Sequence, residues 1–362
     1  MKNIEILMSL QLFAEAGTLV NATGQYVNAY DGTTTPFDDT NTLSGELKTF
    51  YDTELLENAR VEMYYAQFAK RQPLPAGRGK TVEWRKWNTF DKAEKLVEGV
   101  IPTGQKFGMS SKIGTIDQYG TYATVSDQLE LHAYDDVILG ATEEMGASAA
   151  ETQETLIRDA LLTNGNTLYC DNITVATGAV VGTPTTCATM EATAETMSVL
   201  TPDMVAKAVT KLKKDKVPTI GGKYYAVIHP SVAYDLRKSE GWMEAHKYAA
   251  PEQLFNGEIG ELHGCRFIEN PFAPVLSGDY KNKAGSKTYA TYFLGKDAFG
   301  IIDPEGGAME MIVKDKSQVG GPLNQFSTIG YKLETNGATI LYPERVLRVM
   351  SCSSFSATDA TN

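Results

Sequence analysis

The chain has 362 residues, of which 42% are hydrophobic, and its formal net charge is −12. This hydrophobic content is ample for a buried core and excludes a chain that is disordered throughout. The excess of 45 acidic over 33 basic residues argues against a general basic face for nucleic-acid phosphates. No stretch approaches the ~20 apolar residues that span a bilayer, so we expect no membrane contact and only local or indirect contact with nucleic acid.

Residues 1–50 are expected to form an extended arm. Polar residues interrupt the apolar opening MKNIEILMSLQLF, which disfavours a signal peptide. Residues 14–50 are rich in Gly, Thr, Asn and Asp and lack apolar periodicity, so the arm cannot bury enough surface alone to stay ordered. A neighbouring subunit is the simplest support for it. In the next segment, 51–75, apolar residues at helical spacing predict a helix that ends before Pro73.

An extended hairpin is predicted over residues 76–130. The stretch TVEWRKWNTF at 81–90 alternates as a strand does and places Trp84 and Trp87 on opposite faces. The turn-like EGVIPTGQ follows, and a second extended run, QYGTYATVSDQLEL, occupies 118–131. A two-stranded ribbon is only marginally stable in water by itself. We therefore expect this hairpin to lie on another chain.

A long helix is predicted over residues 135–163. Apolar and small residues recur there at steps of three and four, and Asn164-Gly165 supplies a stop. Short extended pieces rich in Thr, Val, Ala and Gly then continue to residue 200. The region 131–200 is thus expected to combine one long helix with a β-rich insertion.

A second helix is predicted over residues 201–218. Thr201 is a suitable N-cap, and Pro202 occupies the first helical position that proline favours. The lysine-rich end at Lys211–Lys216 has two interpretations, a phosphate-binding patch or a solvated helix end favoured by the helix dipole. We favour the solvated helix end.

His229, Pro230 and Ser231 follow a short apolar strand and raise the question of a His/Ser nucleophile. Such a pair also needs an orienting acid and an oxyanion site, and the chain has no GxSxG turn to supply the frame. Pro230 in the first helical position explains the sequence without catalysis, with His229 or Ser231 as the cap. We therefore predict a structural cap or junction here and no catalytic residue.

A three-histidine metal site is the second hypothesis for this region. His229, His246 and His263 are separated by equal intervals of seventeen residues. Histidines that share one metal ion on a helix lie three or four residues apart, whereas Pro251, Gly257 and Gly260 interrupt the chain here. The sequence therefore predicts no metal site and no cofactor.

The cysteines show neither CxxC spacing nor the density of a secreted disulfide scaffold. We expect ordinary thiols of a reducing compartment, although a disulfide across the loop-rich segment between the first two remains open. The four are Cys170, Cys187, Cys265 and Cys352.

Several motifs together resemble one known family. HPSVAYDLR at 229–237 is followed by Trp242, Ala245 and Tyr248 and then by FNGEIGELHGCRFIEN at 255–270. This order is similar to the central region of major capsid proteins of tailed phages of the N4 type, which adopt the Hong Kong 97 capsid fold. EGVIPTG and QYGTYATVSDQLEL also resemble that family, as does LQLFAE near the start. The resemblance extends over most of the chain.

The resemblance implies an α+β fold of the Hong Kong 97 type. Its parts would be an N-terminal arm (1–50), a helix of the arm or peripheral region (51–75), an extended hairpin loop (76–130), a peripheral domain (131–200) with a spine helix (135–163) and a β-rich insertion, an axial domain (201–315), and return strands of the peripheral domain (316–362).

The function implied is that of a shell subunit, without enzymatic activity. It would assemble as hexamers and pentamers into the icosahedral head of a tailed phage, in the bacterial host cytoplasm, and enclose double-stranded DNA by weak contact only. Arm and hairpin would reach neighbouring capsomers, and scaffold, portal and decoration proteins are allowed as further partners. The alternatives are an encapsulin-type nanocompartment and a His/Ser hydrolase. The candidate inter-subunit residues are Trp84, Trp87, Phe37 and Phe13.

Overall fold

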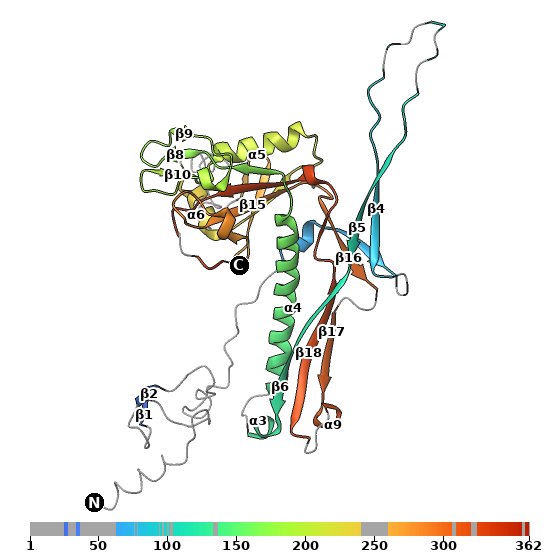
Figure 1. Cartoon of the computed structure of the whole chain (residues 1–362), viewed down its shortest axis with the longest axis vertical. Coiled ribbons are helices and arrows are strands. Elements are labelled where there is room, and N and C mark those ends of the chain that lie inside the picture. The colour runs from blue at the N-terminus through green and yellow to red at the C-terminus, as the bar shows by residue number, and fades with distance from the viewer. Residues whose placement is uncertain are drawn as a thin grey trace, which may run out of the picture. The chain divides into compact units, whose positions relative to one another are not determined.

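The computed structural model describes residues 25–27, 34–36, 63–75, 77, 79–93, 95, 98–99, 101, 104–132, 137–239, 260–305, 309–319, 324–356 and 359–361. The chain divides into two compact units. The first contains Met1–Arg60, Thr124–Ala141 and Lys314–Thr328, and the second contains Val61–Ala123, Thr142–Val313 and Ile329–Asn362. Figure 1 labels the elements of both units.

A seven-stranded mixed sheet forms the centre of the second unit. Its order is β12-β13-β11-β15-β20-β7, with β14 also paired to β15. Every residue of β15 and β20 is buried, which is typical of central strands covered on both faces. The strands are β7 (Thr167–Tyr169), β11 (Tyr224–Ile228), β12 (Glu261–Leu262), β13 (Cys265–Glu269), β14 (Val275–Leu276), β15 (Thr288–Leu294) and β20 (Val346–Ser351).

Two helices pack on one face of this sheet. They are α5 (Pro202–Lys214) and α6 (Pro230–Lys238). Successive strand residues point to opposite faces, and Tyr289 and Phe293 of β15 share a core with the buried side chains of both helices. The predicted helix over 201–218 is confirmed for Pro202–Lys214, and Thr201 Oγ1 accepts the Met204 N–H at 3.3 Å as its N-cap.

The opposite face of the sheet receives the end of the long helix α4 (Val137–Leu162). Ile157 and Leu161 of α4 share a second core with Tyr292 of β15 and with Tyr65. The helix was predicted over 135–163, so both ends agree within two residues. At ~1.5 Å per residue its 26 residues extend about 39 Å. Asn164 follows it and donates to the Val346 carbonyl oxygen at 2.6 Å, which ties the helix end to β20.

The remaining strands form smaller sheets. Their orders are β17-β18-β6, β19-β16-β3, β10-β8-β9, β4-β5 and β1-β2. The bounds are β1 (Gln25–Val27), β2 (Thr34–Pro36), β3 (Lys70–Leu74), β4 (Thr81–Trp87), β5 (Met109–Thr115), β6 (Asp117–Ser126), β8 (Asn172–Thr174), β9 (Val180–Gly182), β10 (Thr196–Met197), β16 (Phe299–Pro304), β17 (Met309–Lys314), β18 (Phe326–Thr335) and β19 (Thr339–Ile340).

The short helices complete the described elements. They are α3 (Asp127–His132), α9 (Lys316–Val319) and the 3-10 turns η2 (Tyr65–Phe68), η3 (Cys187–Thr189), η4 (Gly278–Tyr280) and η5 (Pro343–Arg345). In the part of the chain that the structure describes, none of the helices has the length and apolar character needed to cross a membrane.

The hairpin was predicted with the wrong second strand. β4 pairs with β5 (Met109–Thr115), whereas residues 117–126 form β6, which lies beside β18. The predicted run to residue 131 also ends early, because residues 127–132 are the helix α3. Alternation identifies an extended segment but does not select its partner, and β5 and β6 are separated only by the buried Ile116.

One other expectation differs from the structure. Of the helix predicted at 51–75, the described residues contain only the single turn η2 and then β3. Pro73 lies in β3, an edge strand of its sheet, where a missing N–H is tolerated. In the segment 316–362, β18 pairs with β17 and β6, whereas β20 pairs with β15 and β7; the assignment of this segment to the peripheral domain stays a prediction. A strand whose residues are buried on both faces, as in β20, favours a central position in a sheet that is covered on both sides.

Candidate assembly surfaces

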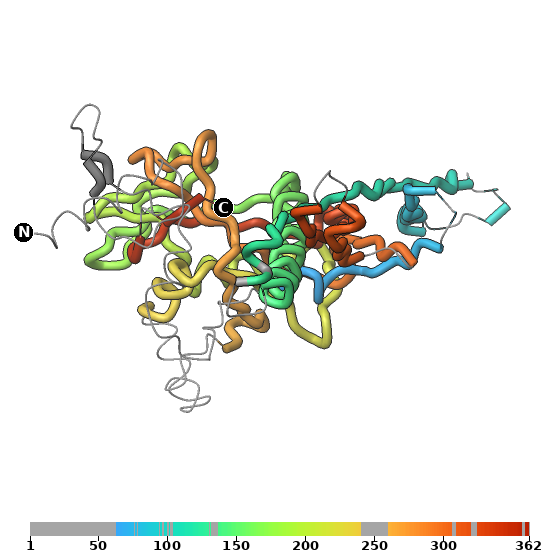
Figure 2. The backbone as a smooth tube through the Cα atoms, turned by 90° about the horizontal axis from the view of Figure 1, so that it is seen from below, coloured from blue at the N-terminus to red at the C-terminus, as the bar shows by residue number. Residues whose placement is uncertain are grey.

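The β4–β5 ribbon extends away from the other elements of its unit. Figures 1 and 2 both show this extension. Seven antiparallel pairs run from Thr81 opposite Thr115 to Trp87 opposite Met109. The Asn88 N–H donates to the Gly108 carbonyl oxygen at 2.9 Å, which adds a further rung. Most ribbon side chains are exposed, so the ribbon has little core of its own.

Trp84 fixes the base of the ribbon inside its own chain. A Cβ at Gly114 of β5 would lie 2.7 Å from the indole Cζ3 atom, and a Cβ at Gly300 of β16 would lie 2.9 Å from Cζ2. The ring therefore packs directly on two glycine backbones. Its Nε1 atom is buried and has no hydrogen-bond partner among the described residues. Trp84 thus packs against its own chain, and an inter-subunit contact stays a prediction for both Trp84 and Trp87.

Charged groups clamp the same base from β4. The Lys86 ammonium lies 3.4 Å from a Glu344 carboxylate oxygen and 4.6 Å from the centre of the Tyr342 ring. The Arg345 guanidinium lies 3.6 Å from the centre of that ring. Each exposed contact is weak alone. Lys86 thus links the ribbon to the 342–345 segment, while Trp84 packs the ribbon on Gly300 of β16.

Three aromatic rings form an exposed stack beyond this base, which we call the aromatic stack. Trp87 and Phe107 lie 4.2 Å apart between ring centres, and Phe90 and Phe107 lie 5.3 Å apart. Their exposed fractions are 60% for Trp87, 58% for Phe90 and 57% for Phe107. Exposed apolar clusters of this kind mark interaction surfaces. The alternation of β4 predicted that Trp84 and Trp87 lie on opposite faces, but Phe90 and Phe107 were missed because they lie outside the regular strands.

The other two candidate contact residues, Phe13 and Phe37, lie outside the described residues. So does most of the predicted arm. An inter-subunit role for these two residues stays a prediction.

His229 and Ser231 meet at the start of α6. His229 is the N-cap residue, Pro230 occupies the first helical position, and the Ser231 N–H donates to His229 Nδ1 at 3.2 Å. An imidazole nitrogen that accepts a hydrogen bond carries no proton, so the His229 proton is on Nε2. Burial lowers the pKa of His229, although Asp359 opposes this effect. The imidazole is therefore neutral near pH 7.

The hydroxyl of Ser231 is directed to a carboxylate and not to the histidine. Ser231 Oγ donates to Asp359 Oδ2 at 2.6 Å, and Tyr289 Oη donates to the same oxygen at 2.7 Å. A serine nucleophile needs a histidine that receives its proton. Burial would raise the pKa of Asp359, but the hydrogen bonds from Ser231, Ser356 and Tyr289 outweigh it and lower the pKa. This geometry attaches the C-terminal segment to α6 and does not form a nucleophile relay.

The metal hypothesis gains no support from the described histidines. His246 lies outside the described residues, and the described ranges contain no group of three or more His, Cys, Asp or Glu side chains suited to a metal ion. The four cysteines are free and buried, so the disulfide left open between Cys170 and Cys187 is not formed. Burial raises the pKa of Cys352 to about 11, which keeps its thiol protonated and unreactive at neutral pH.

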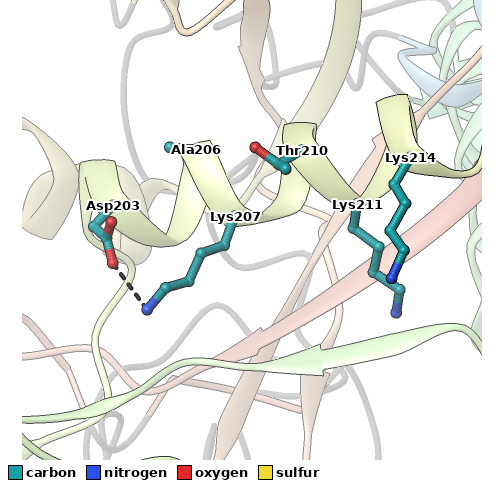
Figure 3. Close-up of a pocket in the computed structure, with 6 residues that line it drawn as sticks. All are labelled: Asp203, Ala206, Lys207, Thr210, Lys211 and Lys214. Carbon is teal, nitrogen blue, oxygen red and sulfur yellow. Dashed lines mark ion pairs between the residues drawn. The ribbon is translucent and has the colours of Figure 1, made fainter.

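The lysine-rich face of α5 has the charge order of an ordinary solvated helix. Figure 3 shows Asp203 at its first turn paired with Lys207, while Lys211 and Lys214 extend from the later turns. Lys207 lies 2.9 Å from Asp203 and 2.5 Å from Asp171, so its charge is already balanced. Acids at the start and lysines at the end of a helix complement its dipole.

A buried carboxylate that the sequence did not reveal joins three segments. Glu154 of α4 is 1% exposed, and its Oε1 atom accepts the Tyr64 and Tyr65 N–H groups at 3.0 Å and the Asn270 amide at 3.1 Å. Burial raises the pKa of Glu154, although these hydrogen bonds and Arg158 oppose the shift. The sequence did hold a signal for this burial, because residue 154 lies three and seven residues before Ile157 and Leu161 and therefore shares their buried helix face.

Solved phage capsid structures share the fold of this chain. The capsid of cyanophage P-SCSP1u matches with 15% identity and a TM-score of 0.60, over 92% of this chain and 100% of that chain. The cyanophage Pam1 capsid matches with 12% identity and a TM-score of 0.66, over 89% and 100%. The Ralstonia phage GP4 capsid matches with 14% identity and a TM-score of 0.64, over 87% and 97%. The expected α+β fold of the Hong Kong 97 type is thus confirmed.

The sequence itself supports the same class. Residues 110–348 match the model of the family described as phage capsid protein, which is about two-thirds of the chain. No curated protein matches in sequence. The chain belongs to the phage capsid protein family. It is a structural shell protein, the major capsid protein of a tailed-phage head.

Proposed function

We propose that this chain assembles as hexamers and pentamers into an icosahedral head that encloses double-stranded DNA. In this proposal the ribbon and the arm at residues 1–50 reach neighbouring capsomers. The observation that carries it is the ribbon, which is fixed at its base by Trp84 and presents Trp87, Phe90 and Phe107 to solvent. An extended ribbon of this kind allows a shell subunit to contact neighbouring subunits that its compact part does not touch.

The finer assignments belong to the same proposal. The ribbon corresponds to the extended hairpin loop, α4 to the spine helix of a peripheral domain, and the seven-stranded sheet with α5 and α6 to an axial domain. The N4-type motifs around residues 229–270 favour that subfamily. Assembly takes place in the host cytoplasm, with scaffold, portal and decoration proteins as allowed partners.

Weak contact with the packaged DNA follows from charge. The net charge of −12 repels a polyanion, and even the lysine face of α5 is partly balanced by Asp171 and Asp203. A wall that holds DNA loosely does not hinder packing or release. Tight binding of free duplex DNA to empty shells at physiological salt would contradict this part of the proposal.

Electron microscopy of the full chain after expression in bacteria tests the central claim. Closed shells or tubes built of hexamers are expected, and particles purified from infected cells should contain DNA. Monomers at every concentration would contradict the proposal. Particles that contain a protein cargo and no DNA would instead support a nanocompartment. Ester hydrolysis that is lost in a His229→Ala variant with intact assembly would restore the hydrolase alternative.

A further inference from the structure

The insertion between β7 and α5 carries a long segment without charge. Residues 172–190 contain no Asp, Glu, Lys or Arg, although these types make up 22% of the chain. The charge at one end is balanced inside the chain, because Asp171 lies 2.5 Å from Lys207. The charge at the other end is balanced in the same way, because Glu191 lies 2.5 Å from Lys283. The segment is therefore neutral on a chain whose net charge is −12.

The tip of the β8–β9 hairpin in this segment exposes apolar side chains. Residues 175–181 read Val-Ala-Thr-Gly-Ala-Val-Val and are all exposed, and the exposed fractions are 56% for Val175, 56% for Val180 and 65% for Val181. Val180 and Gly182 pair with consecutive residues of β8, which leaves Val181 unopposed. A β-bulge of this kind re-aims a side chain. We call Val175, Val180 and Val181 the valine tip.

Hydrogen bonds and a buried base order the hairpin below the valine tip. The Thr174 N–H donates to the Ala179 carbonyl oxygen at 2.9 Å, and the Gly178 N–H donates to the Thr174 carbonyl oxygen at 2.7 Å. At the base, Cys187 and Met190 are buried in a core shared with β20. Figure 1 shows β8, β9 and β10 side by side at the edge of their unit. A surface that is already ordered loses little conformational entropy when it docks.

The lack of charge favours a second copy of the same surface as the partner. Two copies of net charge −12 repel each other, and this repulsion is weakest where the facing surfaces are neutral. A charged partner surface would have its ions desolvated against the valines, which is costly. The aromatic stack of the ribbon differs in this respect, because Lys92, Lys95 and Lys106 accompany it. The valine tip is thus matched in charge by its own counterpart.

We propose that the valine tip of one copy packs against the valine tip of a second copy across a two-fold axis. This inference rests on the shell proposed above and adds a contact to it. The same patch on both partners makes an isologous contact, whereas contacts around a ring of five or six subunits are heterologous. The tip contact therefore joins two capsomers. Three valines bury far less than the ~800 Å² per partner of a standard interface, so the tips meet only where other contacts already hold the capsomers together.

Opposite charges at position 181 test whether the tip meets its own copy. Val181→Asp and Val181→Lys should each raise the protein concentration required for assembly about tenfold, because like charges then face each other. High salt should reduce both defects, since it screens exposed charges. An equimolar mixture of the two variants should assemble within about threefold of the unmodified concentration, because Asp can then face Lys. Unimpaired assembly of both variants, or a mixture no better than either variant alone, would overturn the proposal.

A cysteine at position 181 gives a readout without a change of charge. The four native cysteines are buried, so the added thiol is the accessible one. A short bismaleimide should join Val181→Cys copies into dimers in particles and leave dissociated subunits as monomers. Val313→Cys is the matched control, because Val313 of β17 is also exposed, at 46%, and it should stay monomeric in particles.

The same cross-linking separates the tip contact from the assembly itself. Particles in which Val181→Cys forms no more dimers than Val313→Cys would overturn the tip contact and leave the assembly proposal intact. Cross-links from position 181 to a different protein, in particles from infected cells, would also overturn it. Absence of particles for the unmodified chain would contradict both proposals.

Discussion

Glu154 provides a direct test of how the ribbon-bearing segment is attached to α4. Glu154→Ala removes the acceptor of two backbone N–H groups, those of Tyr64 and Tyr65, and of the Asn270 amide. Each buried donor left without a partner costs about 1–3 kcal/mol. Relief from burying a carboxylate offsets part of this loss, so we expect the free energy of unfolding to fall by about 3 kcal/mol.

The same residue predicts a pH dependence with a definite sign. The pKa of Glu154 is raised from its ordinary value of 4.5 when the chain is folded, so the folded state binds its proton more tightly than the unfolded state. The stability associated with this proton is fully present below the unfolded pKa and is lost as the pH rises through the folded pKa. Glu154→Gln mimics the protonated acid, so its stability should not fall over the same pH range.

Urea unfolding of the unassembled subunit, followed by circular dichroism at several pH values, measures both effects. The unmodified chain should lose stability relative to Glu154→Gln as the pH rises above the ordinary value of 4.5 and through the raised pKa of folded Glu154. A cost below about 1 kcal/mol for Glu154→Ala, or a difference from Glu154→Gln that does not change with pH, would refute the reasoning.

Three further predictions concern the ribbon base, its exposed end and the C-terminal segment. Gly300→Ala places a Cβ 2.9 Å from the indole of Trp84 and should destabilise the subunit by about 1–3 kcal/mol. As its control, Gly146→Ala in α4 places a Cβ that meets nothing within 4 Å and should stabilise the subunit by about 0.5–1 kcal/mol. Thermal unfolding in which Gly300→Ala is the more stable of the two variants contradicts this prediction. Trp87→Ala should raise the threshold concentration for assembly about tenfold or more, while Phe355→Ala, at 66% exposure outside the ribbon, should leave it unchanged in light-scattering measurements. Asp359→Asn should expose the C-terminal segment to carboxypeptidase at neutral pH. Because the pKa of Asp359 is lowered in the folded chain, the difference in digestion rate from the unmodified chain should vanish as the pH falls through that pKa. Equal digestion of both chains at neutral pH argues against attachment of the C-terminal segment to α6 by Asp359.

Local patterns predicted several elements closely. The three- and four-residue spacing located α4, the alternation of TVEWRKWNTF located β4, and Thr201 with Pro202 located the start of α5. These features depend on residues that are close together in the sequence, so the spacing of residue types predicts them directly. The order of the motifs around residues 229–270 similarly led to the capsid family, which the match over residues 110–348 shows.

Strand pairing did not follow from local pattern. β5 and β6 both alternate, and only the tertiary structure assigns β5 to β4 and β6 to the sheet of β18. The same holds for β20, whose apolar run fits any buried sheet and is placed by β15 and β7. Alternation gives the face of a residue but not the identity of its neighbour.

The sequence by itself determined the helix periods, the helix starts and the likeness to capsid proteins. Only the tertiary structure decided that Trp84 packs on glycine backbones of its own chain while Trp87 is exposed, and that Glu154 holds the backbone 90 residues before it in the chain. The physical reason is the range of the contacts. Spacing reports neighbours within a few residues, whereas the ribbon base is held by partners up to 258 residues away, as Lys86 and Glu344 are.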